Sequence, residues 1–464
     1  MLLIIPAAEK MHKMKKILVT SLCAAMLAGG CFQTAQAQPA QVLVLYAFTN
    51  ADGMNPYADL CAGQDGNFYG TTVGGGTNGG FGTVFKVTTN GLLTSLVSFA
   101  GTNGSFSHSE LAQGNDGNFY GTTAGGGDNG YGTVFVVTTN GLLTSLVPFA
   151  DTNGAFPYSS LTMGNDGNFY GTTYYGGSNN ILGTIFRVTT NGVLTSLASF
   201  NNTNGANPIA GLTLGSDGNF YGTTAFGGTN SGNYGTIFQV TPNGVLTSLV
   251  SFNNTNGANP SAGLTLGNDD NLYGATYSGG SYGMGTVFKV TTNGVLTSLA
   301  SFNNSNGANP IAGLTLGSDG NFYGTTVNGG SSNLGTAFQI TTNGVLNSLV
   351  SFNNTNGANP HAGWTPGSDG NFYGTTANGG GATTNGTVVK LIVPPVPGPV
   401  SFSNQIPQVA INGLARPSIQ IQVATDLTAS WSVLTNLVFT NGTGLAIDPA
   451  ATNAPQRFYR AVVQ

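Results

Sequence analysis

Short runs of alternating apolar and polar residues, separated by turn residues, recur along most of the chain. Asp217-Gly218 and Asn243-Gly244 each separate two such runs, and both dipeptides supply the positive φ that tight hairpin turns need. Two consecutive hairpins of this kind predict a sheet of four antiparallel strands, which is the unit of a β-propeller blade. In this stretch the expected strands are 211–214, 220–224, 235–242 and 245–252.

This unit is repeated seven times. The sequence Asp-Gly-Asn-Phe-Tyr-Gly occurs six times, and a degenerate copy that begins at Asp269-Asp270 fills the one gap in the series. Successive copies are 50 to 52 residues apart, and so regular a period indicates stacked copies of one supersecondary unit. The seven copies begin at Asp65, Asp116, Asp166, Asp217, Asp269, Asp319 and Asp369.

The two ends of the repeat array are offset by one strand. The last repeat has only three strands, the third over 386–393, and then stops at Pro394-Pro395. The missing strand precedes the first repeat, where 42–48 matches the fourth-strand sequence. An open array has no reason for this offset, whereas a ring closed in this way leaves no exposed edge. We therefore predict an all-β fold with a seven-bladed β-propeller over 42–393, whose last blade is closed by the N-terminal strand.

Composition agrees with a turn-rich all-β protein. Gly accounts for 73 of 464 residues, and charged residues for only 6%. Disordered chains are poor in aromatic residues and rich in charge, whereas aromatic residues reach 10% here. Two of the three Cys lie in the N-terminal 37 residues, so Cys61 stands alone and no disulfide framework is expected.

The N-terminus has the features of a secretory signal peptide. Lys13 to Lys16 supply positive charge, an apolar run covers 17–30, and Ala35-Gln36-Ala37 is a small-residue cleavage site, so residues 1–37 are predicted to be removed. The alternative is lipid attachment at Cys31, for which Leu27 lies one position too far away. Because no later segment approaches about 20 consecutive apolar residues, we expect no transmembrane segment and a secreted or cell-surface protein.

Net charge argues against a nucleic-acid partner. Removal of residues 1–37 leaves seven Lys and Arg against fifteen Asp and Glu, a net charge of −8. Proteins that bind nucleic acid need a basic surface to contact phosphate groups. No such surface remains, so nucleic acid is not an expected partner.

The repeated motifs resemble a known family. Asp-Gly-Asn-Phe-Tyr-Gly-Thr-Thr, then Gly-Gly, then Gly-Thr-Val-Phe-Lys-Val and then Asn-Gly are similar to the GloVer (Gloeo/Verruco) tandem-repeat family of secreted bacterial proteins, over residues 42–393. The resemblance implies export and surface display, without a defined activity.

The C-terminal part is predicted to be a separate small β-domain. Residues 394–400 are rich in Pro and are expected to form a stiff linker to a module over 401–464. Strands are predicted over 418–424, 431–434 and 458–463, with Trp431 as a core anchor. Because one sheet this small is marginally stable, a β-sandwich is expected. The ending Arg457-Phe458-Tyr459-Arg460 resembles a short β-module of exported proteins.

The repeats also permit comparison within one chain. Just before the first strand, repeats four to six carry Ile209, Ser261 and Ile311, each followed two residues later by Gly. The other repeats depart from this pattern, and in a closed ring they are neighbours. Their candidate ligand-binding residues are Tyr57, Asp59, His108, Glu110, Tyr158, His361 and Trp364. Carboxylates, imidazoles and aromatic rings at a channel mouth are typical of ligand pockets. The alternative is that the terminal repeats have drifted in sequence.

The long connections of each repeat are expected on the opposite face from the two-residue turns, and long loops on a rigid scaffold commonly carry binding sites. They contain aromatic residues that would suit a sugar face or a protein partner, or that pack between blades: Phe81, Tyr131, Tyr174, Tyr175, Phe226, Tyr234, Tyr277 and Tyr282. Each Asp-Gly turn offers a single carboxylate, too few for Ca²⁺, and no metal, cofactor or nucleophile signature is visible.

These observations favour a non-enzymatic extracellular or cell-surface binding or scaffold protein that recognises a glycan or a protein through its long-loop face. One alternative is a structural component of the envelope. Another is a polysaccharide hydrolase or lyase that uses Asp59, Glu110, His108 and His361, provided that the carboxyl groups are about 5 to 10 Å apart. The oligomeric state is left open.

Overall fold

The computed structural model describes residues 31–34, 39–178, 182–381, 384–404, 406–425, 430–439, 442–453 and 456–463. Within these ranges the protein is all-β, and the only helical element is a 3₁₀ turn, η1 (Pro449–Asn453). No helix in the described part of the chain is long and apolar enough to cross a membrane. The predicted signal peptide lies outside the described residues except for β1 (Cys31–Thr34).

Each repeat forms one antiparallel sheet of four strands, and the described residues contain seven such sheets. Repeats 1 to 3 consist of β3 (Cys61–Ala62), β4 (Phe68–Thr71), β5 (Thr83–Val87) and β6 (Leu93–Ser98); β7 (Ala112–Gln113), β8 (Phe119–Thr123), β9 (Thr133–Val137) and β10 (Leu143–Pro148); and β11 (Thr162–Met163), β12 (Phe169–Thr173), β13 (Thr184–Val188) and β14 (Leu194–Ser199).

The later repeats follow the same plan. Repeats 4 to 6 consist of β15 (Thr213–Leu214), β16 (Phe220–Thr224), β17 (Thr236–Val240) and β18 (Leu246–Ser251); β19 (Thr265–Leu266), β20 (Leu272–Thr276), β21 (Thr286–Val290) and β22 (Leu296–Ser301); and β23 (Thr315–Leu316), β24 (Phe322–Thr326), β25 (Thr336–Ile340) and β26 (Leu346–Ser351). Repeat 7 supplies β27 (Thr365–Pro366), β28 (Phe372–Thr376) and β29 (Thr387–Ile392).

The Asp-Gly turn gives the hairpin between the first and second strands its conformation. In repeat 4, Asp217 Oδ1 accepts a hydrogen bond from the Asn219 backbone N–H at 3.1 Å, and Oδ2 accepts from Asn219 Nδ2 at 2.7 Å and from the Tyr221 hydroxyl at 2.8 Å. Gly218 has φ +78°, a conformation in which an L side chain is strained. The carboxylate therefore holds the turn and the buried tyrosine of the second strand together.

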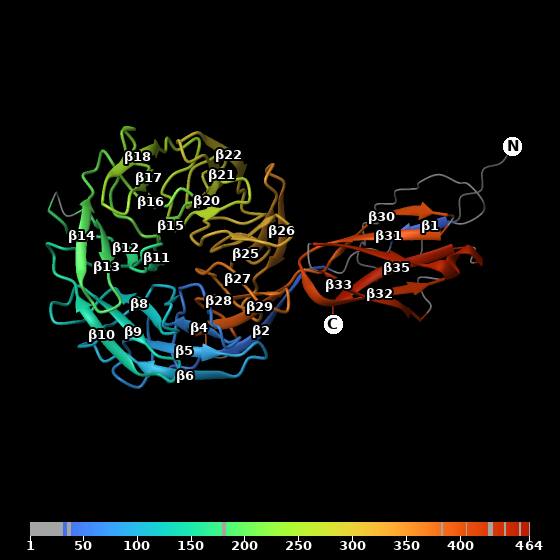
Figure 1. Ribbon diagram of the computed structural model, residues 1–464, viewed down its shortest axis with the longest axis horizontal. Coiled ribbons are helices and arrows are strands. Elements are labelled where there is room, and N and C mark those ends of the chain that lie inside the picture. The colour runs from blue at the N-terminus through green and yellow to red at the C-terminus, as the bar shows by residue number, and fades with distance from the viewer. Residues whose placement is uncertain are drawn as a thin grey trace, which may run out of the picture.

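The sheets are arranged radially around a ring, with β15 nearest the centre and β18 at the outer edge in repeat 4 (Figure 1). Their faces pack against one another through aromatic residues of the second strands. Tyr170 of one sheet stacks on Phe220 of the next with ring centroids 4.2 Å apart, and both are at most 1% exposed. Each hydrophobic cluster of the ring draws residues from two adjacent sheets, so neighbouring repeats share their cores.

The first and last repeats meet in the same way. β2 (Gln41–Ala47) pairs antiparallel with β29 and completes the sheet of repeat 7, which is the pairing predicted from the offset ends. Phe68 of repeat 1 stacks on Tyr373 of repeat 7 at 4.4 Å. Phe48, Phe85 and Val388 are fully buried in the cluster that joins these two sheets.

The ring has two different faces, which we name by their loops. On the short-turn face lie the Asp-Gly and Asn-Gly turns. On the long-loop face lie the connections between the second and third strands and those between successive repeats. These long connections bond to each other, since Ala206 and Phe226 exchange backbone hydrogen bonds of 2.8 and 3.1 Å.

Two further sheets follow the ring, and we call them the C-terminal sheets. One contains β30 (Val396–Ser403), β31 (Ile406–Asn412) and β34 (Thr443–Ile447); the other contains β1, β35 (Gln456–Val463), β32 (Arg416–Ala424) and β33 (Ser432–Phe439). Val409, Ile421, Ala446 and Tyr459 come from both sheets and share one buried cluster. β1 lies within the predicted signal peptide, so a chain cleaved after Ala37 would lack it.

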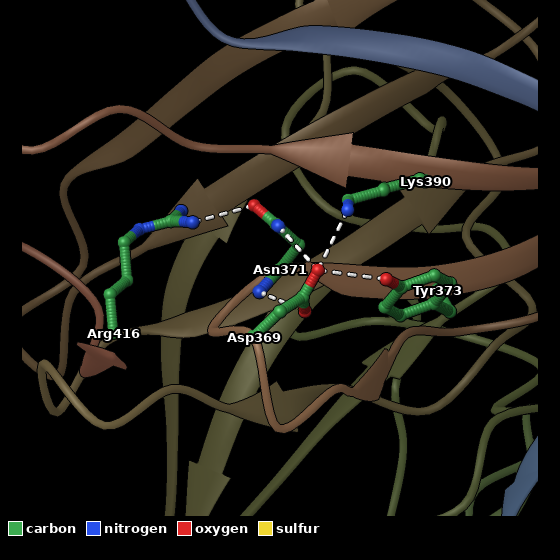
Figure 2. Close-up of polar contacts among 5 residues, drawn as sticks. All are labelled: Asp369, Asn371, Tyr373, Lys390 and Arg416. Carbon is green, nitrogen blue, oxygen red and sulfur yellow. Dashed lines mark hydrogen bonds and ion pairs between the residues drawn. The ribbon is translucent and has the colours of Figure 1, made fainter. Parts of the chain in front are cut away.

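The C-terminal sheets contact the short-turn face at repeats 6 and 7. Arg416, 2% exposed, donates to Asn371 Oδ1 at 2.6 Å and to the Val393 carbonyl oxygen at 2.8 Å. Asn371 belongs to the Asp369 turn, where Lys390 forms a 2.7 Å ion pair with the carboxylate (Figure 2). The Ala415 N–H donates to Ser318 Oγ at 2.6 Å. The turns of two adjacent repeats, at Asp319 and Asp369, therefore bind the C-terminal sheets.

Two sequence-based predictions for this region differ from the structure. The Pro-rich segment 394–400, expected to be a linker, is in large part strand β30, which pairs with β31. Trp431 is partly exposed instead of anchoring the core, and the Arg460 guanidinium lies 4.4 Å from the centre of its ring. An edge strand tolerates Pro, and a cation over an indole face is stable without full burial.

Candidate functional site

All seven repeats contribute to one central cavity of about 750 Å³. Each repeat contributes from the segment that enters its first strand. The lining residues include Phe226 and Tyr277 of the long connections, so the cavity opens on the long-loop face. The outer positions are Tyr57, His108, Tyr158, Ile209, Ser261, Ile311 and His361, and two residues further along lie Asp59, Glu110, Ser160, Gly211, Gly263 and Gly313.

Six of the seven candidate residues from the sequence therefore lie together in this cavity. The comparison between repeats located these residues because packing between sheets fixes most positions of the repeat. A position whose residue type varies is under no such constraint. The sector from repeats 7, 1, 2 and 3 is polar and aromatic. The sector from repeats 4 to 6 adds no charge; it is formed by Ile209, Ser261, Ile311 and glycines, with Phe226 and Tyr277 toward the long-loop face.

Asp59 and Glu110 form the acidic part of the cavity. Asp59 Oδ1 accepts a 2.6 Å hydrogen bond from the Gly363 backbone N–H. The Glu110 backbone N–H donates to Ser160 Oγ at 3.0 Å, but its carboxyl group has no hydrogen-bond partner among the described residues. Burial raises the pKa of the Asp59 carboxyl, and the hydrogen bond from Gly363 offsets part of this effect. Burial also raises the pKa of Glu110, and the nearby charge of Asp59 raises it further.

Four aromatic rings form a row beside these carboxyl groups. His361 stacks on Tyr57 with ring centroids 4.4 Å apart, Tyr57 lies 5.5 Å from His108, and His108 meets Tyr158 edge to face at 5.0 Å. Burial lowers the pKa of both imidazoles to about 4, and for His108 the neighbouring His361 contributes as well. Both histidines are therefore neutral at pH 7 and act as rings and hydrogen-bonding groups, not as cations.

Trp364 does not belong to this site, so its prediction as a ligand-binding residue is corrected. The indole is 3% exposed, and Nε1 donates to the Gly324 carbonyl oxygen at 3.2 Å. It packs between repeats 6 and 7 with Tyr323 and Phe372. The other repeats have a buried Leu at this position, so the substitution changes the core and leaves the cavity wall unaltered.

The aromatic residues of the long connections divide between packing and exposure. Phe81, Tyr131 and Tyr234 pack against the clusters between sheets. Tyr174 packs edge to face on Tyr158 at 5.5 Å and so supports the cavity wall. Four remain at least 36% exposed on the long-loop face: Tyr175, Phe226, Tyr277 and Tyr282.

Among the described residues, no group of three or more His, Cys, Asp or Glu could hold a metal ion. Cys61 is partly buried, and burial together with the Glu110 charge raises its pKa to about 12, so the thiol stays protonated at neutral pH. The chemistry available in the cavity is thus that of two carboxyl groups, neutral rings and a few hydroxyl groups.

The fold defines an all-β tandem-repeat protein. The sequence pattern of the Gloeobacter/Verrucomicrobia repeat matches residues 19–231 and 182–389, most of the chain. The protein belongs to this repeat family, as its repeated motifs indicated. No curated protein matches the sequence.

Two solved structures are similar at low identity. A gluconolactonase from Xanthomonas campestris is 14% identical, with a TM-score of 0.40, over 67% of this chain and 96% of its own. A puromycin hydrolase is 12% identical, with a TM-score of 0.49, over 82% of this chain and 62% of its own. At these values the similarity supports no inference about the activity of this chain.

Proposed function

We propose that the ring is a seven-bladed β-propeller and that the protein is a secreted or cell-surface binding protein which takes a glycan into the central cavity from the long-loop face. The observation that carries this proposal is the central cavity, which is lined by six residues that depart from the repeat pattern. Its volume falls within the range of about 300 to 1,000 Å³ that is usual for ligand sites. The pairing of β2 with β29 supports closure of the propeller, and the N-terminal sequence supports export.

Aromatic rings favour a sugar as the ligand. The row from His361 to Tyr158 offers flat apolar faces, and Ser160 and Ser261 add hydroxyl groups. Sugar rings have apolar faces edged by hydroxyl groups, so they suit a wall of this composition. In this proposal the C-terminal sheets form a separate module on the short-turn face and leave the cavity open.

The first test is a glycan array probed with the full chain and with variants that borrow residues from other repeats. Tyr57→Ile copies Ile209, so it replaces the ring by a side chain that the same position already accommodates in repeat 4. We expect affinity for the bound glycan to fall about tenfold, since loss of ring stacking and partial burial costs about 1.4 kcal/mol.

Tyr282→Ile is the matched control, because Tyr282 is 61% exposed on the same face but does not line the cavity. An equal loss of glycan affinity in both variants would place binding on the exposed loops of the long-loop face and contradict the proposal. If no glycan binds the intact chain, a structural role in the envelope gains support instead.

A second candidate function, a polysaccharide hydrolase or lyase, has one observation in its favour. Asp59 and Glu110 share a cavity, and both have raised pKa values, as the general acid of a carboxyl pair does. The same array glycans incubated with the protein distinguish the two functions. Release of shorter products, abolished in Glu110→Gln, would establish catalysis, whereas unchanged glycans support binding alone.

A further inference from the structure

The central cavity contains two carboxyl groups, and its basic lining residues are two imidazoles, His108 and His361. None of its lining residues is Lys or Arg. Four of the described cations are engaged elsewhere, with Lys390 on Asp369, Arg416 on Asn371, Arg457 near Asp448 and Arg460 over Trp431. The two imidazoles are neutral at pH 7. The described residues of the cavity wall therefore supply no positive charge to balance Asp59 and Glu110.

The hydrogen bonds of the pair are also incomplete. Asp59 has the Gly363 N–H, but the Glu110 carboxyl has no partner in the described residues, although it lines the cavity. Glu110 is half-buried, and a carboxylate partly removed from water is costly unless it is paired or hydrogen-bonded. Its raised pKa reflects that cost. A ligand that brings a cation into the cavity would pair with the carboxylate and remove this desolvation cost.

The surrounding rings favour a cation over an anion. The faces of aromatic rings are electron-rich and attract cations, by about 0.5 to 2 kcal/mol per contact. Tyr57 and Tyr158 lie on either side of His108 in the row, within the same sector as the two carboxyl groups. An anionic ligand would meet both carboxylates and gain nothing from these rings.

The wall opposite the two carboxyl groups indicates what kind of molecule carries the positive charge of the ligand. Ile209, Ile311 and the glycines of repeats 4 to 6 give a wide, uncharged surface, and the cavity of about 750 Å³ is much larger than an ammonium group. A thin aliphatic chain such as a lysine side chain would fill little of this space. A sugar ring would fill more of it and could stack on the aromatic row.

We propose that the ligand is a glycan with a free amino sugar, whose protonated amine sits between Asp59 and Glu110 while its ring lies against the Tyr57 side of the cavity. This inference rests on the proposed function and narrows it to a class of ligand. Recognition needs no metal or cofactor and no bond is made or broken.

The test is isothermal titration calorimetry of the full chain with two probes that differ only at nitrogen, triglucosamine and tri-N-acetylglucosamine, at about pH 6. We expect the free amine to bind at least tenfold more tightly. Its binding should release protons, seen as heats that depend on the buffer, because an ammonium favours the ionised carboxylates. The titratable groups around the pair are Tyr57, His108, Tyr158, His361 and Cys61; both histidines stay mostly neutral at this pH.

Glu110→Gln should abolish the preference for the free amine, as should Glu110→Ser, which copies Ser160 of the next repeat and guards against misfolding. Asp128→Asn removes the same charge from an exposed loop of the same repeat and should change nothing. Equal affinity for the two probes, or an unchanged preference in Glu110→Gln, overturns the inference.

The outcomes also separate this inference from the proposed function. If both probes bind equally and Tyr57→Ile abolishes this binding, the glycan site is supported and only the preference for a free amine is refuted. If trilysine binds and triglucosamine does not, the ligand is a cation but not a sugar, and the inference is refuted. If neither the probes nor the array glycans bind, both the proposed function and the inference fail.

Discussion

Two glycines in equivalent turns test whether the C-terminal sheets are docked on the ring. Gly370 and Gly167 occupy the same position in repeats 7 and 3, with φ +73° and +75°. A Cβ on Gly167 would meet no described heavy atom within 4 Å, whereas a Cβ on Gly370 would overlap the Ala415 carbonyl oxygen. Gly370→Ala therefore perturbs residues 413–416, which we call the docking loop, and Gly167→Ala is its control for backbone strain.

The expected difference follows from the contacts that the docking loop makes. Both variants lose about 1 to 2 kcal/mol because Ala is strained at positive φ. In Gly370→Ala the loop must also move. Full release would forfeit two hydrogen bonds of Arg416, one of the Ala415 N–H, and the burial of Leu414, which is 4% exposed. Net values of about 1 kcal/mol per hydrogen bond and about 2 kcal/mol for a buried Leu give an upper limit of about 5 kcal/mol. We expect about 3 kcal/mol beyond the control.

Denaturant unfolding followed by tryptophan fluorescence measures this difference. The chain has two Trp, so a Trp364→Phe background leaves Trp431 of the C-terminal sheets as the reporter. Gly370→Ala should shift the Trp431 transition to lower denaturant and increase hydrogen exchange at the Ala415 amide. Equal shifts in the two variants, with that amide still protected, would show that the docking contacts contribute nothing.

Two further predictions concern the turns and the core. Hydrogen bonds from Asn219 and Tyr221 lower the pKa of Asp217 even though burial opposes them, so its stabilising effect is present above about pH 4 and is lost as pH falls through the lower folded value. The destabilisation by Asp217→Asn should therefore be largest at pH 7 and shrink toward pH 2 in thermal melts; a penalty independent of pH would refute a role for the charge. Trp364→Leu restores the residue of the other repeats but leaves a void and removes the indole hydrogen bond to Gly324, so it should cost about 2 kcal/mol of unfolding free energy without changing ligand affinity. Loss of binding at unchanged stability would return Trp364 to the ligand site.

The repeat sheets could be predicted because their signals are local and occur seven times. The Asp217 and Asn243 turns set the hairpins, and the expected second strand 220–224 is β16 as the structure has it. The C-terminal sheets were harder because each signal occurs once. There, the partner of Trp431 is Arg460, 29 residues away, and the Pro-rich segment becomes a strand only because β31 pairs with it.

The candidate site could be predicted to the extent that variation between repeats marks it. Tyr57 and Glu110 stand out because other repeats have Ile or Gly at the same positions. Trp364 stands out for the same reason, yet its side chain points into the core, where every equivalent Leu is buried. The contact of Arg416 with Asn371 joins segments 45 residues apart and has no local pattern, so only the three-dimensional arrangement reveals it.

The pairing of β2 with β29 also sets an order of folding. A chain that emerges from its N-terminus releases β2 first, and its partner strand follows about 340 residues later. In the meantime the third strand of every earlier repeat is captured by its own fourth strand through a short hairpin, because nearby segments meet fastest. β2 therefore stays unpaired until β29 is synthesised. It is more apolar than most other fourth strands, because Leu43 and Val44 replace their Thr and Ser. A chain truncated before the last repeat would retain this apolar strand without a partner and would be prone to aggregate.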